Sequence, residues 1–151
     1  MARINEEVAS LLVPMVARPM LVPNVTVAEI VDWHAPERRE GDPDWMLGMF
    51  HWRGIDIPLV SLELMNDPEE DEGYTGARIA VLNGVGVSKQ DFYAVCVQGI
   101  PRLVRVYPVE IGGEEKIENA PAFDMLATVN GERAMIPDLD YIEQQISALL
   151  A

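Results

Sequence analysis

Short apolar runs, each interrupted by proline, glycine or charged residues, follow one another along the chain. Proline and glycine each occur 11 times and are spread throughout, with short β-branched runs between them, a pattern typical of many short strands. The strands predicted on this basis are 11–16, 21–23, 49–52, 55–60, 78–82, 92–98 and 103–107. The chain is therefore predicted to be mainly β.

Two glycine-containing turns stand out between the predicted strands. Asn130-Gly131 separates two alternating segments in "MLATVNGERAMIP", and this dipeptide is the strongest short-range hairpin signal. Arg53-Gly54 interrupts "MFHWRGIDIPLV" and predicts a tight turn that delivers the arginine to a surface.

The region before that second turn is less regular. "NVTVAEIVDW" (24–33) fits either a strand or one or two helical turns with Asn24 as a cap. "HAPERREGDPD" (34–44) is polar and rich in proline and charge, and it is interpreted as a loop.

The last stretch, "DLDYIEQQISALLA" (138–151), changes from strand to helical periodicity. Pro137 and Asp138 supply helix start signals. The residues expected on the apolar face are Leu139, Ile142, Ile146, Leu149 and Leu150. We expect this face to close the core of its own domain in preference to binding a partner.

An acidic loop, "NDPEEDEG" (66–73), divides the strands into an earlier and a later group. Such a charge run is usually a solvated loop, and each group of strands has about the size that a small barrel needs. We therefore predict one domain over 1–151 made of two linked small barrels. The approximate subdomains are 9–66 and 76–137, with a terminal helix at 138–150.

Composition and charge argue against several classes of partner. Apolar residues make up 49% of the 151-residue chain and charged residues 24%, and no apolar run approaches the roughly 20 residues of a membrane span. The N-terminal "MARINEEVASLLVPM" lacks the basic-then-apolar layout of a secretory signal, so we expect a soluble, cytoplasmic protein. The net charge of -14 repels phosphates, which argues against nucleic acid and direct membrane insertion.

Candidate catalytic and metal-binding groups are few. His34 and His51 share no metal-ligand spacing, and the acidic loop lacks the ligand spacing of a calcium site. Cys96, the only cysteine, lies in an apolar strand and is expected to be buried. The carboxylates cluster in the acidic loop and at the helix start, where nothing desolvates them. We expect no catalytic residue, no metal and no cofactor.

Arg53, with Trp52 and Gly54 beside it, forms a candidate binding anchor. Arginine and tryptophan are over-represented where interfaces carry their binding energy. Alternatively, Arg53 pairs with a carboxylate of its own domain and Trp52 fills the core. The residues alone favour neither interpretation.

In "GMFHWRGIDIPLVSL" (48–62), the spaced residues are Gly48, Arg53, Gly54, Pro58 and Leu62. Their arrangement resembles the segment G-x-x-N-L-R-G-x-x-x-P-x-x-D-L of the CheW family of chemotaxis coupling proteins. "LVPNVTVAEI" (21–30), "YAVCVQGIPRLVRV" (93–106) and "AMIPDLDYI" (134–142) resemble further segments of that family in the same order. The likeness covers roughly residues 9 to 148.

The chain departs from the family pattern at several positions. His51 stands for the usual asparagine, Ser61 for the aspartate after the proline, and Gln98 for the strand aspartate. The turn "MVARPML" also lacks the usual glycine. These departures suggest an auxiliary member, of the kind that accompanies chemosensory arrays controlling type IV pilus twitching motility.

The resemblance implies a non-catalytic protein made of two five-stranded SH3-like barrels packed together, with a C-terminal helix. It implies an adaptor, recruited to membrane receptor arrays, that bridges the cytoplasmic tip of a methyl-accepting chemoreceptor to the regulatory domain of a CheA-type histidine kinase. Receptor helices lie in an apolar groove between the barrels of such proteins. The groove residues carried over are Val27, Arg53 and Leu103, with Val31 and Ile100 as neighbours.

Two hypotheses from other classes stand beside the adaptor. One is a stand-alone SH3-like module that grips proline-rich peptides with Trp33, Trp45 or Trp52. The other is a small enzyme that uses His51 and a nearby carboxylate as acid and base.

Overall fold

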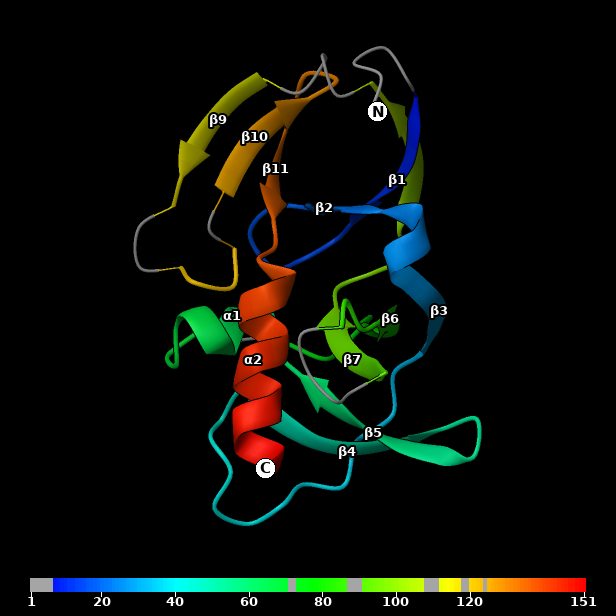
Figure 1. Cartoon of the computed structure of the whole chain (residues 1–151), viewed down its shortest axis with the longest axis vertical. Helices are drawn as coiled ribbons and strands as arrows, with labels where there is room; N and C mark the ends of the chain where they lie inside the picture. The colour runs from blue at the N-terminus through cyan, green and yellow to red at the C-terminus, as the bar shows by residue number, and fades with distance from the viewer. Residues whose placement is uncertain (1–6, 71–72, 87–90, 108–111, 118–119, 124) are drawn as a thin grey trace.

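The structure, a computed structural model, consists of two β-sheets and two α-helices over the described residues 7–70, 73–86, 91–107, 112–117, 120–123 and 125–151 (Figure 1). In spatial order, the six-stranded sheet contains β8 (Arg102–Val106), β1 (Val8–Val13), β2 (Met20–Pro23), β11 (Glu132–Ile136), β10 (Met125–Val129) and β9 (Gly112–Lys116). The five-stranded sheet contains β3 (Val27–Asp32), β6 (Arg78–Asn83), β7 (Phe92–Val97), β5 (Ile55–Val60) and β4 (Met46–Trp52). The prediction of a mainly β chain with two SH3-like barrels is confirmed, although one sheet has six strands where five were expected.

The strands do not divide at the acidic loop, so the predicted subdomain boundaries 9–66 and 76–137 are wrong. The five-stranded sheet comes from one continuous stretch, β3 to β7, and the six-stranded sheet combines β1 and β2 with β8 to β11. β1 pairs with β8 from Val8↔Val106 to Leu12↔Arg102, which joins the start of the chain to a strand that follows the five-stranded sheet in sequence. The acidic loop connects two strands of the same sheet, because charge marks a solvated loop and carries no information on strand pairing.

Local elements follow the sequence signals to different extents. Both predicted hairpins form, β4 with β5 and β10 with β11. The undecided segment 24–33 becomes a short 3₁₀ turn, η1 (Asn24–Thr26), followed by β3, and no side chain caps the turn, so Asn24 is not the cap. Neither β9 nor α1 (Leu62–Asn66) was predicted from the sequence. The first turn of α1 is capped by the Ser61 hydroxyl, which accepts from the Leu64 N–H at 3.1 Å.

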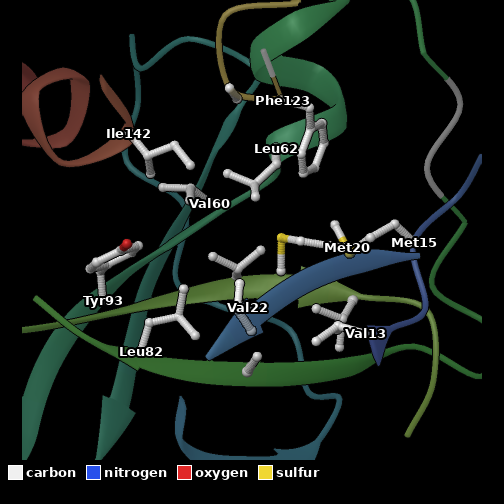
Figure 2. Packing of buried hydrophobic residues seen from close by; sticks show 14 of the residues in the cluster. Val13, Met15, Met20, Val22, Val60, Leu62, Leu82, Tyr93, Phe123 and Ile142 are labelled. Carbon is white, nitrogen blue, oxygen red and sulfur yellow. The ribbon is translucent and has the colours of Figure 1, made fainter. Parts of the chain in front are cut away.

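The main hydrophobic core lies between the two sheets, as Figure 2 shows. Val13, Met20 and Val22 of the six-stranded sheet pack in one cluster with Leu82 and Tyr93 of the five-stranded sheet. The opposite face of each sheet covers a smaller cluster of its own. The cluster of the five-stranded sheet contains Leu47, Phe50, Trp52, Ile57, Leu59, Ala77, Ile79, Val81, Ala94 and Cys96.

The terminal helix α2 (Leu139–Leu150) packs onto the main core, where Ile142 and Ile146 are fully buried. Asp138 caps it by accepting from the Tyr141 N–H at 3.0 Å. The prediction that this helix closes the core of its own domain is confirmed. Within the described part of the chain, no helix has the length and apolarity needed to cross a membrane.

Two carboxylates contradict the expectation that all of them are exposed. Glu63 of α1 is 8% exposed and Glu143 of α2 is 0% exposed. Glu63 Oε1 accepts from the Val16 N–H at 3.0 Å, and Glu143 Oε2 accepts from the Val85 N–H at 2.7 Å. Each helix thus uses a buried carboxylate to hold the backbone of a loop, and main-chain donors partly replace the lost water.

Candidate partner-binding site

Arg53 lies at the tip of the β4–β5 hairpin. Arg53 and Gly54 have φ values of 48° and 82°, and two successive positive φ values are the signature of a two-residue type I′ turn. The last pair of the ladder before the turn is Trp52↔Ile55. The Arg53 side chain is 68% exposed, so the prediction that this turn delivers the arginine to a surface is confirmed.

Glu29 of β3 holds both residues that precede the turn glycine. Its Oε1 accepts from Trp52 Nε1 at 2.9 Å and from Arg53 Nε at 3.1 Å. The Arg53 guanidinium also lies 5.2 Å from the centroid of the Trp52 ring, within the range of a cation–π contact. Trp52 fills the core while Arg53 pairs with a carboxylate of its own domain, as the second interpretation of the sequence expected.

Arg53 nevertheless keeps binding capacity. The contacts found among the described residues use Nε and the face of the guanidinium, which leaves the two terminal nitrogens to donate elsewhere. A guanidinium fixed through Nε offers its outer N–H groups to a carboxylate in a defined direction. The side chain is therefore both an internal partner of Glu29 and an oriented surface donor.

A bulge in β3 explains why Glu29 reaches Trp52. Val27 pairs with Leu82 and Glu29 pairs with Val81, with a register shift between them. Leu82 belongs to the main core and Val81 to the cluster of the five-stranded sheet. Paired residues on neighbouring strands share a face of the sheet. Simple alternation would place Val27 and Glu29 on the same face, but the bulge places them on opposite faces.

Val27 and Leu103 lie at the margin of the main core. Val27 is half-buried against it, and Leu103 pairs with Leu11, which also packs against it. Leu103 is 54% exposed, and Ile100, in the connection that precedes β8, is 70% exposed. The turn η1 next to Val27 contacts β1, the neighbour of β8, so these apolar side chains belong to two sheet edges that meet.

Val31 lies apart from this margin. It pairs with Ile79 and packs against the cluster of the five-stranded sheet, as Trp52 does. The seven residues expected at the site therefore fall into three groups. Val27 and Leu103 lie at the margin of the main core with Ile100 exposed just before β8, Arg53 and Gly54 form the hairpin tip, and Val31 and Trp52 pack against the cluster of the five-stranded sheet.

A pocket of about 230 Å³ lies on the outer side of β4. Both histidines line it, together with Glu37 and Asp56, and His51 Nδ1 lies 2.9 Å from Asp56 Oδ1. The sequence showed no relation between His34 and His51, because the loop before β4 folds back over the strand to bring them together. No group of three or more histidine, cysteine, aspartate or glutamate side chains in the described ranges is arranged to hold a metal ion.

That loop is fastened to β4 by a two-way backbone bridge. The Glu37 N–H donates to the Met49 carbonyl at 2.9 Å, and the Met49 N–H donates to the Glu37 carbonyl at 2.8 Å. Gly48 has a φ of 146°, and a Cβ there would lie 2.5 Å from the Glu37 oxygen. Only glycine allows the two backbones to approach so closely.

The family model of the CheW-like domain matches residues 10–146. The chain belongs to the CheW-like domain family. A solved structure of similar fold is that of the scaffolding protein TtCheW from Thermoanaerobacter tengcongensis, with a TM-score of 0.74 and 14% sequence identity over 91% of this chain and 88% of that chain. No curated protein sequence matches the chain.

The structure gives a physical account of one departure from the CheW pattern and locates a second. Ser61, in place of the usual aspartate, is buried and caps α1, a role that serine and aspartate share. Gln98, in place of a strand aspartate, donates its backbone N–H to the Pro14 carbonyl at 2.8 Å, which fastens the end of β7 to the segment after β1. The Ser61 cap is local, whereas the Gln98 bond joins distant segments through the backbone and leaves the change of side chain without a structural explanation.

Proposed function

We propose that this CheW-like protein is a non-catalytic adaptor that links the cytoplasmic tip of a chemoreceptor to the regulatory domain of a CheA-type histidine kinase. Family membership supports a scaffold role in chemotaxis signalling. The observation that carries the proposal is Arg53, which is held by Glu29 and Trp52 and still exposes its outer nitrogens. A buried arginine side chain at this position would be unable to contact a partner protein.

The proposed receptor contact is helix-in-groove. An amphipathic receptor helix would place apolar side chains against Val27, Ile100 and Leu103, where two of the three are largely exposed. Arg53 would pair with a carboxylate of that helix and set its register. Val31 and Trp52 would not contact the helix themselves. They would support the site by holding β3 and the β4–β5 hairpin in position.

We further propose that the protein is an auxiliary, ChpC-type member of a chemosensory system that controls type IV pilus twitching motility. The departures at His51, Ser61 and Gln98 support this assignment. The adaptor would be cytoplasmic and would be recruited to receptor arrays through its partners.

The test is binding of Arg53→Ala to a receptor-tip helix peptide and to the kinase regulatory domain. Arg53→Ala should weaken association with one of them about tenfold or more, since a charge-assisted bidentate pair is lost, and the melting temperature should change little. Arg39→Ala is the matched control, because Arg39 is another exposed arginine that pairs with an aspartate of its own chain, Asp42. Unchanged binding of Arg53→Ala to both partners would contradict the proposal.

A second candidate, a small acid–base enzyme, is favoured by the His51–Asp56 pair at the wall of a pocket. Both side chains are about two-thirds exposed, at 70% and 67%, so water screens their interaction. His51→Gln separates the two functions. An enzyme would lose turnover with this variant, whereas an adaptor would retain its partners.

The stand-alone peptide-binding module receives less support. Trp52 is buried, and Trp45 packs against the main core. Trp33 stacks on Tyr74 with ring centroids 4.4 Å apart. The three tryptophans are thus engaged within the fold and do not form the open aromatic surface that a proline-rich ligand needs.

A further inference from the structure

A second pocket lies where α1 meets the turn between β1 and β2. It has a volume of about 130 Å³, and its lining residues are Val16, Ala17, Glu63, Asn66, Asp67, Glu70, Phe123 and Met135. None of these residues belongs to the groove or hairpin tip discussed above. Apolar side chains form one part of the lining and three carboxylates the other, with no basic residue among them.

Glu63 is the unusual member of this lining. It is more than nine-tenths buried, and its Oε1 accepts from the Val16 N–H. Its Oε2 is buried and has no hydrogen-bond partner among the described residues. A buried carboxylate oxygen left without a donor costs free energy, so a donor supplied from outside would find a ready acceptor.

The surroundings favour a cation as that donor. Asp67 and Glu70 line the same pocket, and the chain as a whole carries a net charge of -14. No group of acidic, histidine and cysteine side chains in the described segments is arranged to hold a metal ion. We therefore consider an organic cation as the donor to Glu63 Oε2. The apolar lining of Val16, Phe123 and Met135 suits a cation that arrives on an apolar stem.

We propose that this pocket receives an arginine side chain of a partner protein. The guanidinium donates to the rim carboxylate of Glu70 and, after a small turn of the Glu63 side chain toward the pocket, to Glu63 Oε2, which is buried in this structure. Arginine fits better than lysine because its planar fork reaches two carboxylates at once. The pocket volume admits one side chain and excludes a folded segment, so the contact is a single anchor within a larger interface.

The proposal goes beyond the adaptor function and does not depend on the receptor groove. The two sites share no residue, so a variant of one leaves the other intact. If Glu63→Gln does not affect binding of the arginine peptide, the pocket proposal has failed and the adaptor proposal stands. If Arg53→Ala does not affect binding of the receptor helix or the kinase domain, the adaptor proposal has failed and the pocket proposal stands.

The experiment is a titration of the full chain with the peptide acetyl-Ala-Arg-Ala-amide, followed by amide ¹H–¹⁵N chemical shifts. The control peptide carries citrulline, which has the shape of arginine without its charge. We expect saturable shifts at Val16 and Ala17 that diminish with added salt, and binding of the citrulline peptide weaker by about tenfold or more. Equal binding of the two peptides, or shifts confined to other regions, would overturn the proposal.

Variants locate the contact. Glu63→Gln keeps an acceptor for the Val16 N–H and removes the charge, so it should weaken binding of the arginine peptide by about tenfold. Glu69→Gln is the matched control, because Glu69 is an exposed neighbour with the same charge that does not line the pocket. Should Glu63→Gln fail to fold, Glu70→Gln tests the rim in its place. Equal binding by the variant used and by Glu69→Gln would count against the proposal.

The chain itself offers a competing cation. Arg18 follows Ala17, is exposed, and makes no ion pair with a described residue. If Arg18 occupied the pocket in solution, Arg18→Ala would bind the arginine peptide more tightly than the natural chain does. We expect the affinity of Arg18→Ala to be unchanged, and a marked increase would assign the pocket to the chain's own side chain.

Discussion

Glu29 and Trp52 are joined by a 2.9 Å hydrogen bond from the indole nitrogen to a carboxylate oxygen that also accepts from Arg53. The same oxygen therefore accepts one hydrogen bond from a buried side chain and one from an exposed side chain. Trp52 is buried, whereas the Arg53 side chain is 68% exposed. Stability and binding are thus expected to respond differently to substitutions in this group.

Glu29→Ala should lower the free energy of unfolding by about 1–3 kcal/mol, because it leaves the buried indole N–H without its acceptor. Glu29→Gln keeps an acceptor and should lose less. Arg53→Ala should cost no more than about 1 kcal/mol, since it removes an exposed ion pair. Chemical denaturation of the three variants measures these differences, and a larger loss in Arg53→Ala than in Glu29→Ala would contradict the assignment.

Gly48→Ala should destabilise the protein through the crossing of Glu37 over β4. The new Cβ would lie 2.5 Å from the Glu37 oxygen at a φ of 146°, and a backbone strained in this way costs about 1–3 kcal/mol before the clash is counted. Gly73→Ala is the control, because a Cβ at Gly73 meets no atom within 4 Å. Thermal melts of the two variants should differ clearly, and equal melting temperatures would argue against the bridge.

Tyr93 should make the protein sensitive to alkali. Burial raises the pKa of Tyr93 well above its ordinary value of 10.0, and the Glu143 and Asp140 carboxylates raise this pKa further. The unfolded chain ionises this tyrosine first, so stability should be constant below pH of about 10 and fall above it. In Tyr93→Phe this part of the alkaline loss should disappear.

Tyr93→Phe should also leave stability at neutral pH unchanged or slightly increased. The buried Tyr93 hydroxyl has no hydrogen-bond partner among the described residues, so its removal breaks no such bond. Tyr107→Phe serves as the control, because the Tyr107 hydroxyl contacts Glu7 near the surface. Denaturation across a pH series measures both effects, and identical alkaline profiles for Tyr93→Phe and the natural chain would exclude this role.

Ser61→Ala should lower the free energy of unfolding by about 1 kcal/mol, the usual cost of a lost helix N-cap. The cap of α1 is the Ser61 hydroxyl, which accepts from the Leu64 N–H. Ser147→Ala applies the same substitution within α2, where no cap is involved and alanine is the better helix former. The two variants should therefore move in opposite directions in urea denaturation, and equal losses would argue against the cap.

Local signals in the sequence predicted local structure. Asn130-Gly131 and Arg53-Gly54 set the turns of the two hairpins because positive φ values restrict which residues fit there. The helical period of Ile142 and Ile146 predicted the buried face of the terminal helix. In each case, the information lies within a few consecutive residues.

Long-range relationships were beyond such signals. The parallel pairings of β2 with β11 and of β5 with β7 join segments that are far apart in the chain, and no short pattern records them. Glu29 was missed as a site residue because the bulge in β3 changes its face. A lone acidic residue within the apolar "VAEIV" was the available hint. Glu63 was missed because its burial depends on a contact with Val16, in another part of the chain.

The order of strands in the two sheets has a consequence for synthesis on the ribosome. Every strand of the five-stranded sheet is made before β8 and β11, whereas β1 and β2 are made first, pair with each other, and must wait for β8 and β11 to cover their two outer edges. The nascent chain therefore holds a hairpin with two open edges at its leading end while all the strands of the neighbouring sheet have already been made. Cotranslational folding would begin in the middle of the polypeptide and finish by joining its extremities.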